Sequence, residues 1–221
     1  MDRRTQAERR AASRSALIEA ATALFGELGY AGTTLRDIGE RAGVSSGLVA
    51  YHFGSKEALF EAVMESIREV VTETASRSGV PELRGLDRLE GLLAVYLRGY
   101  IRPPTIERPE PGGSLGRTVF VAMAEAISAT PELRRVVAAN DALFRRQITD
   151  ALREAVDDGV VQIDAATDPE TEAVVIMGMV RGIALQHLVS PAEVDIEAAL
   201  ANVLAMIGRH YRADANSDGS T

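Results

Sequence analysis

The chain has 221 residues, of which 46% are hydrophobic and 25% charged, a composition typical of a soluble globular protein. It contains no cysteine, which excludes disulfides, thiolate metal sites and cysteine nucleophiles and agrees with a cytoplasmic location. The net charge of −8 is spread unevenly: residues 1–60 carry 8 Lys and Arg against 7 Asp and Glu, whereas residues 61–221 carry 16 against 25. A nucleic-acid-binding surface is therefore expected near the N-terminus.

Apolar residues recur at helical spacing along most of the chain, and no convincing alternation of apolar and polar residues occurs. This pattern predicts an all-α fold. The first apolar stripe runs from Leu17 to Leu28, and Gly29 is expected to end that helix. Five arginines within residues 1–16 precede and enter this helix, and charge alone does not distinguish a binding surface from a solvated tail.

The segment from Gly32 to Phe60 carries the most specific pattern. It predicts a short helix from Leu35 to Ala42, a tight turn at Gly43–Ser45, and a second short helix from Ser46 to Phe53. Two short helices joined by a three- or four-residue turn that contains glycine form a helix-turn-helix motif. The small residues Gly39 and Ala42 are expected to let the two helices cross closely, and Gly43 to supply a positive φ.

The rest of the chain is predicted to be helical. A long helix is expected from Ser55 to Ser76, then another over Leu86–Tyr100, and the proline-rich residues Arg102–Ser114 are expected to form a loop. The helix Pro169–Val189 is apolar nearly all round, and burial on more than one side is expected for it. The last helix, Asp195–Tyr211, carries an apolar stripe of Ile196, Leu200, Val203, Leu204 and Ile207. These two helices predict either a monomeric core or, as the favoured interpretation, a homodimer that packs them into a four-helix bundle.

The run TTLRDIGERAGVSSGLVAYHFGSKEALFEAV, at positions 33–63, resembles the DNA-binding domain of TetR-family transcription regulators. The resemblance covers about residues 10–65, and its marks are the AGVS turn, YHF at the end of the second short helix, and SKEALF at the start of the long one. It implies a three-helix DNA-binding head within residues 1–54, a helical ligand-binding and dimerisation domain over 55–212, and a disordered tail over 213–221.

The resemblance also implies a set of DNA contacts. These are Thr34, Arg36, Ser45, Ser46, Gly47, Leu48, Ala50, Tyr51, His52 and Lys56. Phosphate contacts, which fix position rather than sequence, are expected from Tyr51, His52 and Lys56, the only lysine in the chain. Leu48 and Ala50 can touch thymine methyl groups but cannot hydrogen-bond a base. The arginine arm before Arg14 is expected to enter a flanking minor groove.

A small-molecule effector and an apolar pocket are implied as well. The candidate lining residues are Tyr96, Tyr100, Phe120, Met123, Phe144, Met177 and His187, although each of them also suits ordinary core packing. No cofactor and no metal site are predicted, because the three histidines lack ligand spacing. The stretch Ala173–Val189 is interrupted by Arg181 and is interpreted as a buried helix rather than a membrane span.

The predicted function is sequence-specific, ligand-controlled regulation of transcription, with repression favoured over activation. A homodimer would read a near-palindromic operator. An enzyme is disfavoured because the sequence has no phosphate-binding glycine loop and no nucleophile motif. A nucleoid protein is disfavoured by the acidic net charge, and a recombinase by the lack of a catalytic serine or tyrosine cluster.

Overall fold

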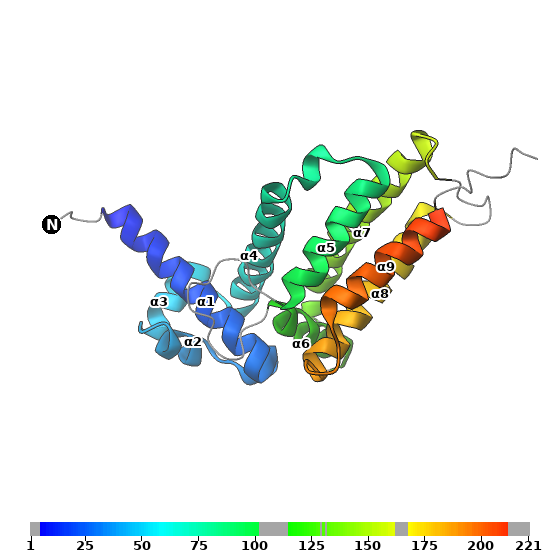
Figure 1. Ribbon diagram of the computed structural model, residues 1–221. Helices are drawn as coiled ribbons and strands as arrows, with labels where there is room; N and C mark the ends of the chain where they lie inside the picture. The colour runs from blue at the N-terminus through cyan, green and yellow to red at the C-terminus, as the bar shows by residue number, and fades with distance from the viewer. Residues whose placement is uncertain (1–4, 102–114, 129, 131, 162–167, 212–221) are drawn as a thin grey trace, which may run out of the picture. The chain divides into compact units, whose positions relative to one another are not determined.

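The computed structural model describes residues 5–101, 115–128, 130, 132–161 and 168–211. Within this part of the chain the elements are nine α-helices and one short 3-10 helix, η1, so the all-α prediction is confirmed (Figure 1). The helices form two compact units, and α4 and α7 contribute residues to both. The loop predicted over Arg102–Ser114 and the tail predicted over 213–221 lie outside the described residues.

The first unit falls within Met1–Val70 and Arg102–Asn140. It contains α1 (Gln6–Gly32), α2 (Leu35–Arg41), α3 (Ser46–Phe53), the first part of α4 (Lys56–Arg77), α6 (Leu115–Ser128) and the start of α7 (Leu133–Asp157). Its core includes Leu17, Phe25, Ile38, Val49 and Phe60, each of which is at most 1% exposed. The stripes predicted for α1 and α4 meet in this core, where the ring centres of Phe25 and Phe60 are 5.7 Å apart.

Helix α1 begins earlier than its apolar stripe does. The Thr5 hydroxyl accepts a hydrogen bond from the Glu8 N–H at 3.2 Å, and the Glu8 carboxylate accepts one from the Thr5 N–H at 2.7 Å. This capping box starts the helix at Gln6, so residues 6–14 are helical. A helix with its side chains is about 10 Å across and the minor groove about 6 Å wide. Arg9 and Arg10 are therefore presented on a helix, whereas the part of the predicted arm at residues 1–4 lies outside the described residues, and its contact with a minor groove stays a prediction.

Gly29 breaks α1 as predicted, but the helix does not stop there. Its φ of 77° interrupts the helical path, and α1 then continues to Gly32. The carboxylate of Glu125 on α6 accepts hydrogen bonds from the freed N–H groups of Tyr30 at 2.6 Å and Ala31 at 3.0 Å. A Cβ added at Gly29 would lie 2.7 Å from the nearer carboxylate oxygen of Glu125. Glycine is thus required here by both its φ and the close carboxylate.

The second unit falls within Val71–Ile101 and Asp141–Thr221. It contains the end of α4, η1 (Val80–Glu82), α5 (Gly85–Ile101), most of α7, α8 (Pro169–Val189) and α9 (Ile196–Tyr211). Helix α8 starts as predicted, because Asp168 accepts a hydrogen bond from the Thr171 N–H at 2.9 Å and Pro169 occupies the first turn. Its buried residues are Ala173, Ile176, Met177, Val180 and Ala184.

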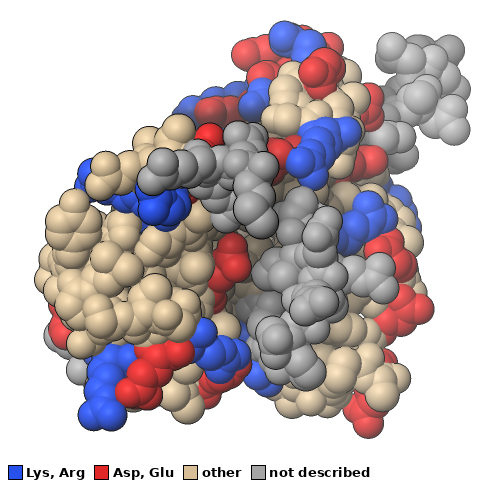
Figure 2. All heavy atoms as spheres, turned by 90° about the vertical axis from the view of Figure 1, so that its left-hand side faces the viewer, with Lys and Arg blue, Asp and Glu red and all other residues tan. Residues whose placement is uncertain are grey.

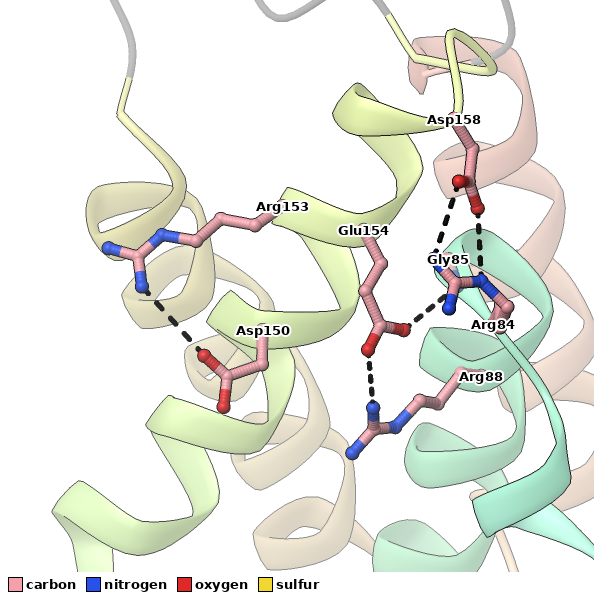
Figure 3. Close-up of polar contacts among 7 residues, drawn as sticks. All are labelled: Arg84, Gly85, Arg88, Asp150, Arg153, Glu154 and Asp158. Atoms are coloured by element: carbon pink, nitrogen blue, oxygen red, sulfur yellow. Dashed lines mark hydrogen bonds and ion pairs between the residues drawn. The ribbon is translucent and has the colours of Figure 1, made fainter.

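A polar network fixes the start of α5 to the end of α7 (Figure 3). The Glu154 carboxylate accepts hydrogen bonds from the Gly85 N–H at 3.3 Å and from Arg88 at 2.8 Å, while Arg84 pairs with Asp158 at 3.4 Å. A Cβ added at Gly85, whose φ is 54°, would lie 3.2 Å from the Ala155 Cα. The Glu154 carboxylate thereby satisfies the Gly85 N–H at the start of α5, which has no partner within the helix.

Within this chain α8 and α9 each keep an exposed apolar side, so the burial of α8 on more than one side, which a homodimer would supply, stays a prediction. Val174, Val175, Leu185 and Val189 on α8 are between 47% and 75% exposed, and Met206 on α9 is 51% exposed. The α9 stripe expected at the subunit interface lies mostly inside the second unit instead, with Leu200, Val203 and Ile207 at most 5% exposed. Among the described helices, α8 is long and apolar enough to cross a membrane. Its Arg181, however, pairs with Asp141 of α7.

Candidate nucleic-acid interface

The helix-turn-helix forms where the sequence predicted it, from α2, the turn at residues 42–45, and α3. The Thr34 hydroxyl caps α2 by accepting a hydrogen bond from the Asp37 N–H at 3.2 Å. The Ser45 hydroxyl caps α3 by accepting one from the Leu48 N–H at 3.3 Å. The hydroxyl and the N–H of Thr34 both donate to the Asp37 carboxylate, and these hydrogen bonds hold the pKa of Asp37 below its usual range.

The two short helices cross closely because Gly39 has no side chain. A Cβ added there would lie 2.9 Å from the Val44 carbonyl oxygen and 3.1 Å from the Ser46 nitrogen. The Gly39 carbonyl in turn accepts a hydrogen bond from the Val44 N–H at 2.8 Å. Gly43 has a φ of 70°, as the turn was expected to require. The roles predicted for Gly39 and Gly43 are therefore confirmed.

Helix α3 buries one face and leaves the other open. Val49 is fully buried, whereas Ser46, Gly47 and Ala50 are exposed and Tyr51 is 67% exposed. Leu48 and His52 are partly exposed. The exposed face is small and weakly polar, so that it can approach base edges in a major groove without carrying charge.

The comparisons with known proteins bear directly on this motif. The family model of bacterial regulatory proteins of the TetR family matches residues 17–63, and the model of the BetI-type transcriptional repressor C-terminal domain matches residues 114–212. An HTH-type transcriptional repressor of Mycobacterium tuberculosis is 32% identical over 177 residues, which cover 73% of this chain and 94% of that protein. The chain belongs to the TetR family. It is accordingly a DNA-binding regulator of transcription of the helix-turn-helix type.

Two further matches, a protein sequence and a solved structure, each cover most of this chain. The HTH-type transcriptional regulator BetI of Rhizobium meliloti is 26% identical over 207 residues, covering 93% of this chain and 92% of that protein. The crystal structure of AibR in complex with isovaleryl coenzyme A and operator DNA superposes with a TM-score of 0.67 at 21% identity, covering 88% of this chain and 97% of that one. The fold of a helix-turn-helix head followed by a helical C-terminal region is thus shared along the whole chain.

The arginines of the motif in this TetR-family protein are both held in ion pairs. Arg36 lies 2.7 Å from Glu40, one turn later on the exposed side of α2. The Glu40 hydrogen bond and charge raise the pKa of Arg36. Arg41 makes two hydrogen bonds to the Glu27 carboxylate of α1, at 3.1 and 3.2 Å. A DNA contact by Arg36, as the resemblance implies, would have to compete with its carboxylate partner.

Lys56 has a structural role that the sequence did not predict. Its Nζ donates hydrogen bonds to the carbonyl oxygens of Tyr30 at 2.9 Å and Thr33 at 3.0 Å, at the end of α1. It also lies 4.3 Å from the centre of the Tyr30 ring. An ammonium group has three donors, so one of them is still available for the predicted phosphate contact. Lys56 therefore caps the C-terminal end of α1, in addition to its predicted contact with a DNA phosphate.

The residues predicted to line a ligand pocket do not all lie together in the structure. Tyr96 and Phe144 lie together in the second unit, with ring centres 4.8 Å apart, and the Tyr96 hydroxyl donates to the Gln147 side chain. Burial raises the pKa of Tyr96, so the phenol stays protonated as a donor. Met177 is 2% exposed in the core of the second unit, and His187 Nδ1 lies 2.8 Å from the Val194 carbonyl oxygen.

The remaining three candidates are partly exposed. Tyr100 lies near the end of α5, whereas Phe120 and Met123 lie on α6, in the first unit. The second unit has a cavity of about 110 Å³ between the end of α4, η1, α5 and α7. It is lined by Val71, Thr72, Ala75, Ser76, Val80, Pro81, Arg88, Leu92, Tyr96 and Gln147. Tyr96 is thus the one sequence-predicted residue that lines this cavity.

The polar lining residues Arg88, Gln147, Thr72 and Ser76 were missed by the sequence analysis. No local pattern marks them, because they converge from three helices far apart in the chain. Within the residues that the structure describes, no group of three or more His, Cys, Asp or Glu side chains is arranged to hold a metal ion.

Proposed function

We propose that this TetR-family regulator is a transcriptional repressor that binds a near-palindromic operator as a homodimer. The observation that carries the proposal is the exposed face of α3, on a helix-turn-helix whose caps and close crossing hold it rigidly. Ser46, Gly47, Leu48 and Ala50 would meet base edges, and Thr34, Ser45, Tyr51, His52 and Lys56 the phosphates. Arg36 would join them once released from Glu40.

The experiment that tests DNA recognition is selection of bound fragments from a randomised duplex pool at about 150 mM salt, where non-specific binding is weak. We expect an enriched near-palindrome whose half-sites are one helical turn apart, about 34–36 Å. Tyr51→Ala is the negative control, in which the enrichment should be lost. This exposed side chain can be removed without opening the core. Absence of an enriched sequence with the parent protein would contradict the proposal.

Repression is tested separately by transcription in vitro from a promoter that carries the selected sequence. The family model of BetI-type repressors and the M. tuberculosis relative, itself named a repressor, favour a decrease in transcript. An increase in transcript would instead support activation, the alternative that the sequence left open. The same template with a scrambled operator controls for effects that do not depend on the site.

The homodimer is supported by the exposed apolar residues of α8 and α9, namely Val174, Val175, Leu185, Val189 and Met206. A second copy related by a two-fold axis would cover this face with its own and form a four-helix bundle. Val203, a natural choice from the sequence, is a poor test because it lies in the core. Leu185→Glu should give a monomer in sedimentation, whereas Val156→Glu, at a 40% exposed position on α7, should not. A dimeric Leu185→Glu protein would contradict this interface.

Control by a small effector is supported by the cavity of the second unit and by AibR, whose structure holds isovaleryl coenzyme A together with operator DNA. The cavity offers apolar walls with Arg88, Tyr96 and Gln147 as polar groups, a lining that suits a small organic ligand. Helix α4 is the expected lever, because its first part belongs to the first unit and its end lines the cavity. By linkage, effector and DNA would change each other's affinity equally, by about 1–3 kcal/mol.

We also propose that this regulator needs no catalysis, cofactor or metal. It acts in the cytoplasm and does not bind a membrane. The apolar face of α8 is then accounted for by the partner subunit rather than by lipid. A protein that remains in the supernatant when mixed with vesicles of anionic and neutral phospholipid would agree with this assignment, and sedimentation with the vesicles would contradict it.

A further inference from the structure

The helix-turn-helix of this chain offers DNA little free positive charge. Its arginines, Arg36 and Arg41, are paired with Glu40 and Glu27. Helix α3 has no Lys or Arg, and Lys56 already donates to two carbonyl oxygens. Because phosphate neutralisation supplies most of the sequence-independent affinity for DNA, another source of positive charge is needed.

Such a source lies beside α3, on the first turns of α1. Arg10 lies 5.6 Å from the centre of the Tyr51 ring, and Arg14 lies 5.3 Å from the centre of the Phe53 ring. The two arginines are four residues apart, so both project from one side of α1. Arg9, Arg10 and Arg14 are all exposed, and no ion pair joins any of them to another described residue.

The contact with an aromatic ring positions each guanidinium without using its hydrogen bonds. The attraction of a cation to the face of a ring needs no hydrogen bond, and a guanidinium has five N–H donors to offer. These donors suit two-point contacts with phosphate oxygens, and the ring removes part of the entropy cost of ordering a long side chain. Figure 2 shows a face with a broad uncharged area that has both basic and acidic groups at its edges.

We propose that Arg10 and Arg14 form a second phosphate-binding surface, which extends the DNA contact beyond α3 to the backbone that flanks each half-site. This inference rests on the proposed function. It concerns two arginines that lie before the segment matched by the TetR family model, which begins at residue 17. The first turns of α1 thereby supply the affinity, while α3 supplies the sequence reading.

The test measures the dissociation constant of a fluorescent duplex carrying the selected operator and flanking base pairs, from 50 to 200 mM salt. The variant is Arg10→Gln/Arg14→Gln. The matched control is Arg77→Gln/Arg146→Gln, which makes the same charge change at exposed positions of α4 and α7. Glutamine keeps the helix propensity close to that of arginine.

Each lost phosphate contact should lower the slope of log affinity against log salt by about 0.9, and a dimer would lose up to four contacts. The slope would then fall by about 3.6, so the loss of affinity over this fourfold salt range would shrink about a hundredfold. The control should keep the parent slope. Arg10→Lys/Arg14→Lys should restore most of the slope because the charge returns.

Failure of this inference is distinguishable from failure of the proposed function. If the parent binds its operator specifically and the Arg10→Gln/Arg14→Gln protein has the parent slope, only the second surface is refuted. If the parent shows no sequence preference, the proposed function fails, and the slopes on random duplex still decide whether these arginines meet phosphate. Equal loss of slope in the control variant would show a general charge effect and overturn the assignment.

Discussion

Replacing Gly39 by alanine tests whether the close crossing of α2 and α3 determines the stability of the DNA-binding head. The new Cβ would lie 2.9 Å from the Val44 carbonyl oxygen, 3.1 Å from the Ser46 nitrogen and 3.2 Å from the Ser45 carbonyl carbon. All three atoms belong to the backbone of the turn and the start of α3, so no side-chain rotation can relieve the contact.

Two opposing effects set the size of the change. Alanine is favoured over glycine inside a helix by about 0.8–1 kcal/mol, which would stabilise α2. Forcing an extra methyl group into a packed site costs about 1–3 kcal/mol. Since the overlap involves three backbone atoms, the higher end of that range applies, and we expect a net loss of about 1–2 kcal/mol in the free energy of unfolding.

The assay is urea unfolding followed by far-ultraviolet circular dichroism, with hydrogen exchange to localise the change. Exchange should accelerate in residues 35–53 more than in α8 and α9. Gly47→Ala in α3 is the matched control, because its Cβ would meet only the Ser45 Oγ, at 3.8 Å. That variant should gain up to about 1 kcal/mol. A Gly39→Ala protein as stable as the parent would refute the packing argument.

Two other changes test the contacts that shape the helices. Glu125→Gln leaves one uncharged oxygen to accept hydrogen bonds from the Tyr30 and Ala31 N–H groups. The free energy of unfolding, measured by urea titration, should fall by about 1.5–3 kcal/mol. An unchanged unfolding midpoint would contradict this role. The pKa of Asp168 is lowered by hydrogen bonds from Thr171, so its contribution to stability is full above the ordinary Asp pKa and is lost as the pH falls through the lower folded value. Asp168→Asn, which still caps α8 but does not titrate, should therefore lose less stability than the parent on acidification below about pH 4, measured by thermal melts across that range. Parallel pH profiles for the two proteins would exclude this assignment.

The sequence by itself determined the helices and the motif. The apolar spacing in α1, α4 and α5, the glycine turn at Gly43 and the proline after Asp168 are local features, and local backbone geometry is what they encode. The core residues Leu17, Ile38 and Val49 were likewise predictable, because the apolar face of an amphipathic helix has to be covered.

Tertiary structure decided where the charges and the free surfaces lie. The sequence could not show that Arg41 of α2 pairs with Glu27 of α1, or that Lys56 closes the end of α1. It also could not tell whether the α9 stripe that includes Val203 faces the core of its own subunit or a partner, and only the packing within the second unit shows that it faces inward.

The lining of the cavity likewise could not be predicted from the sequence. Arg88, Tyr96 and Gln147 converge from α5 and α7, and nothing in their local sequence records that convergence. Helical periodicity fixes which side of one helix is apolar, but it does not fix what that side meets. For this protein, the chain's local pattern therefore gave the helices and the DNA-reading motif, and long-range packing chose the charge partners that lie far apart in the sequence, such as Glu27 for Arg41 and Asp141 for Arg181.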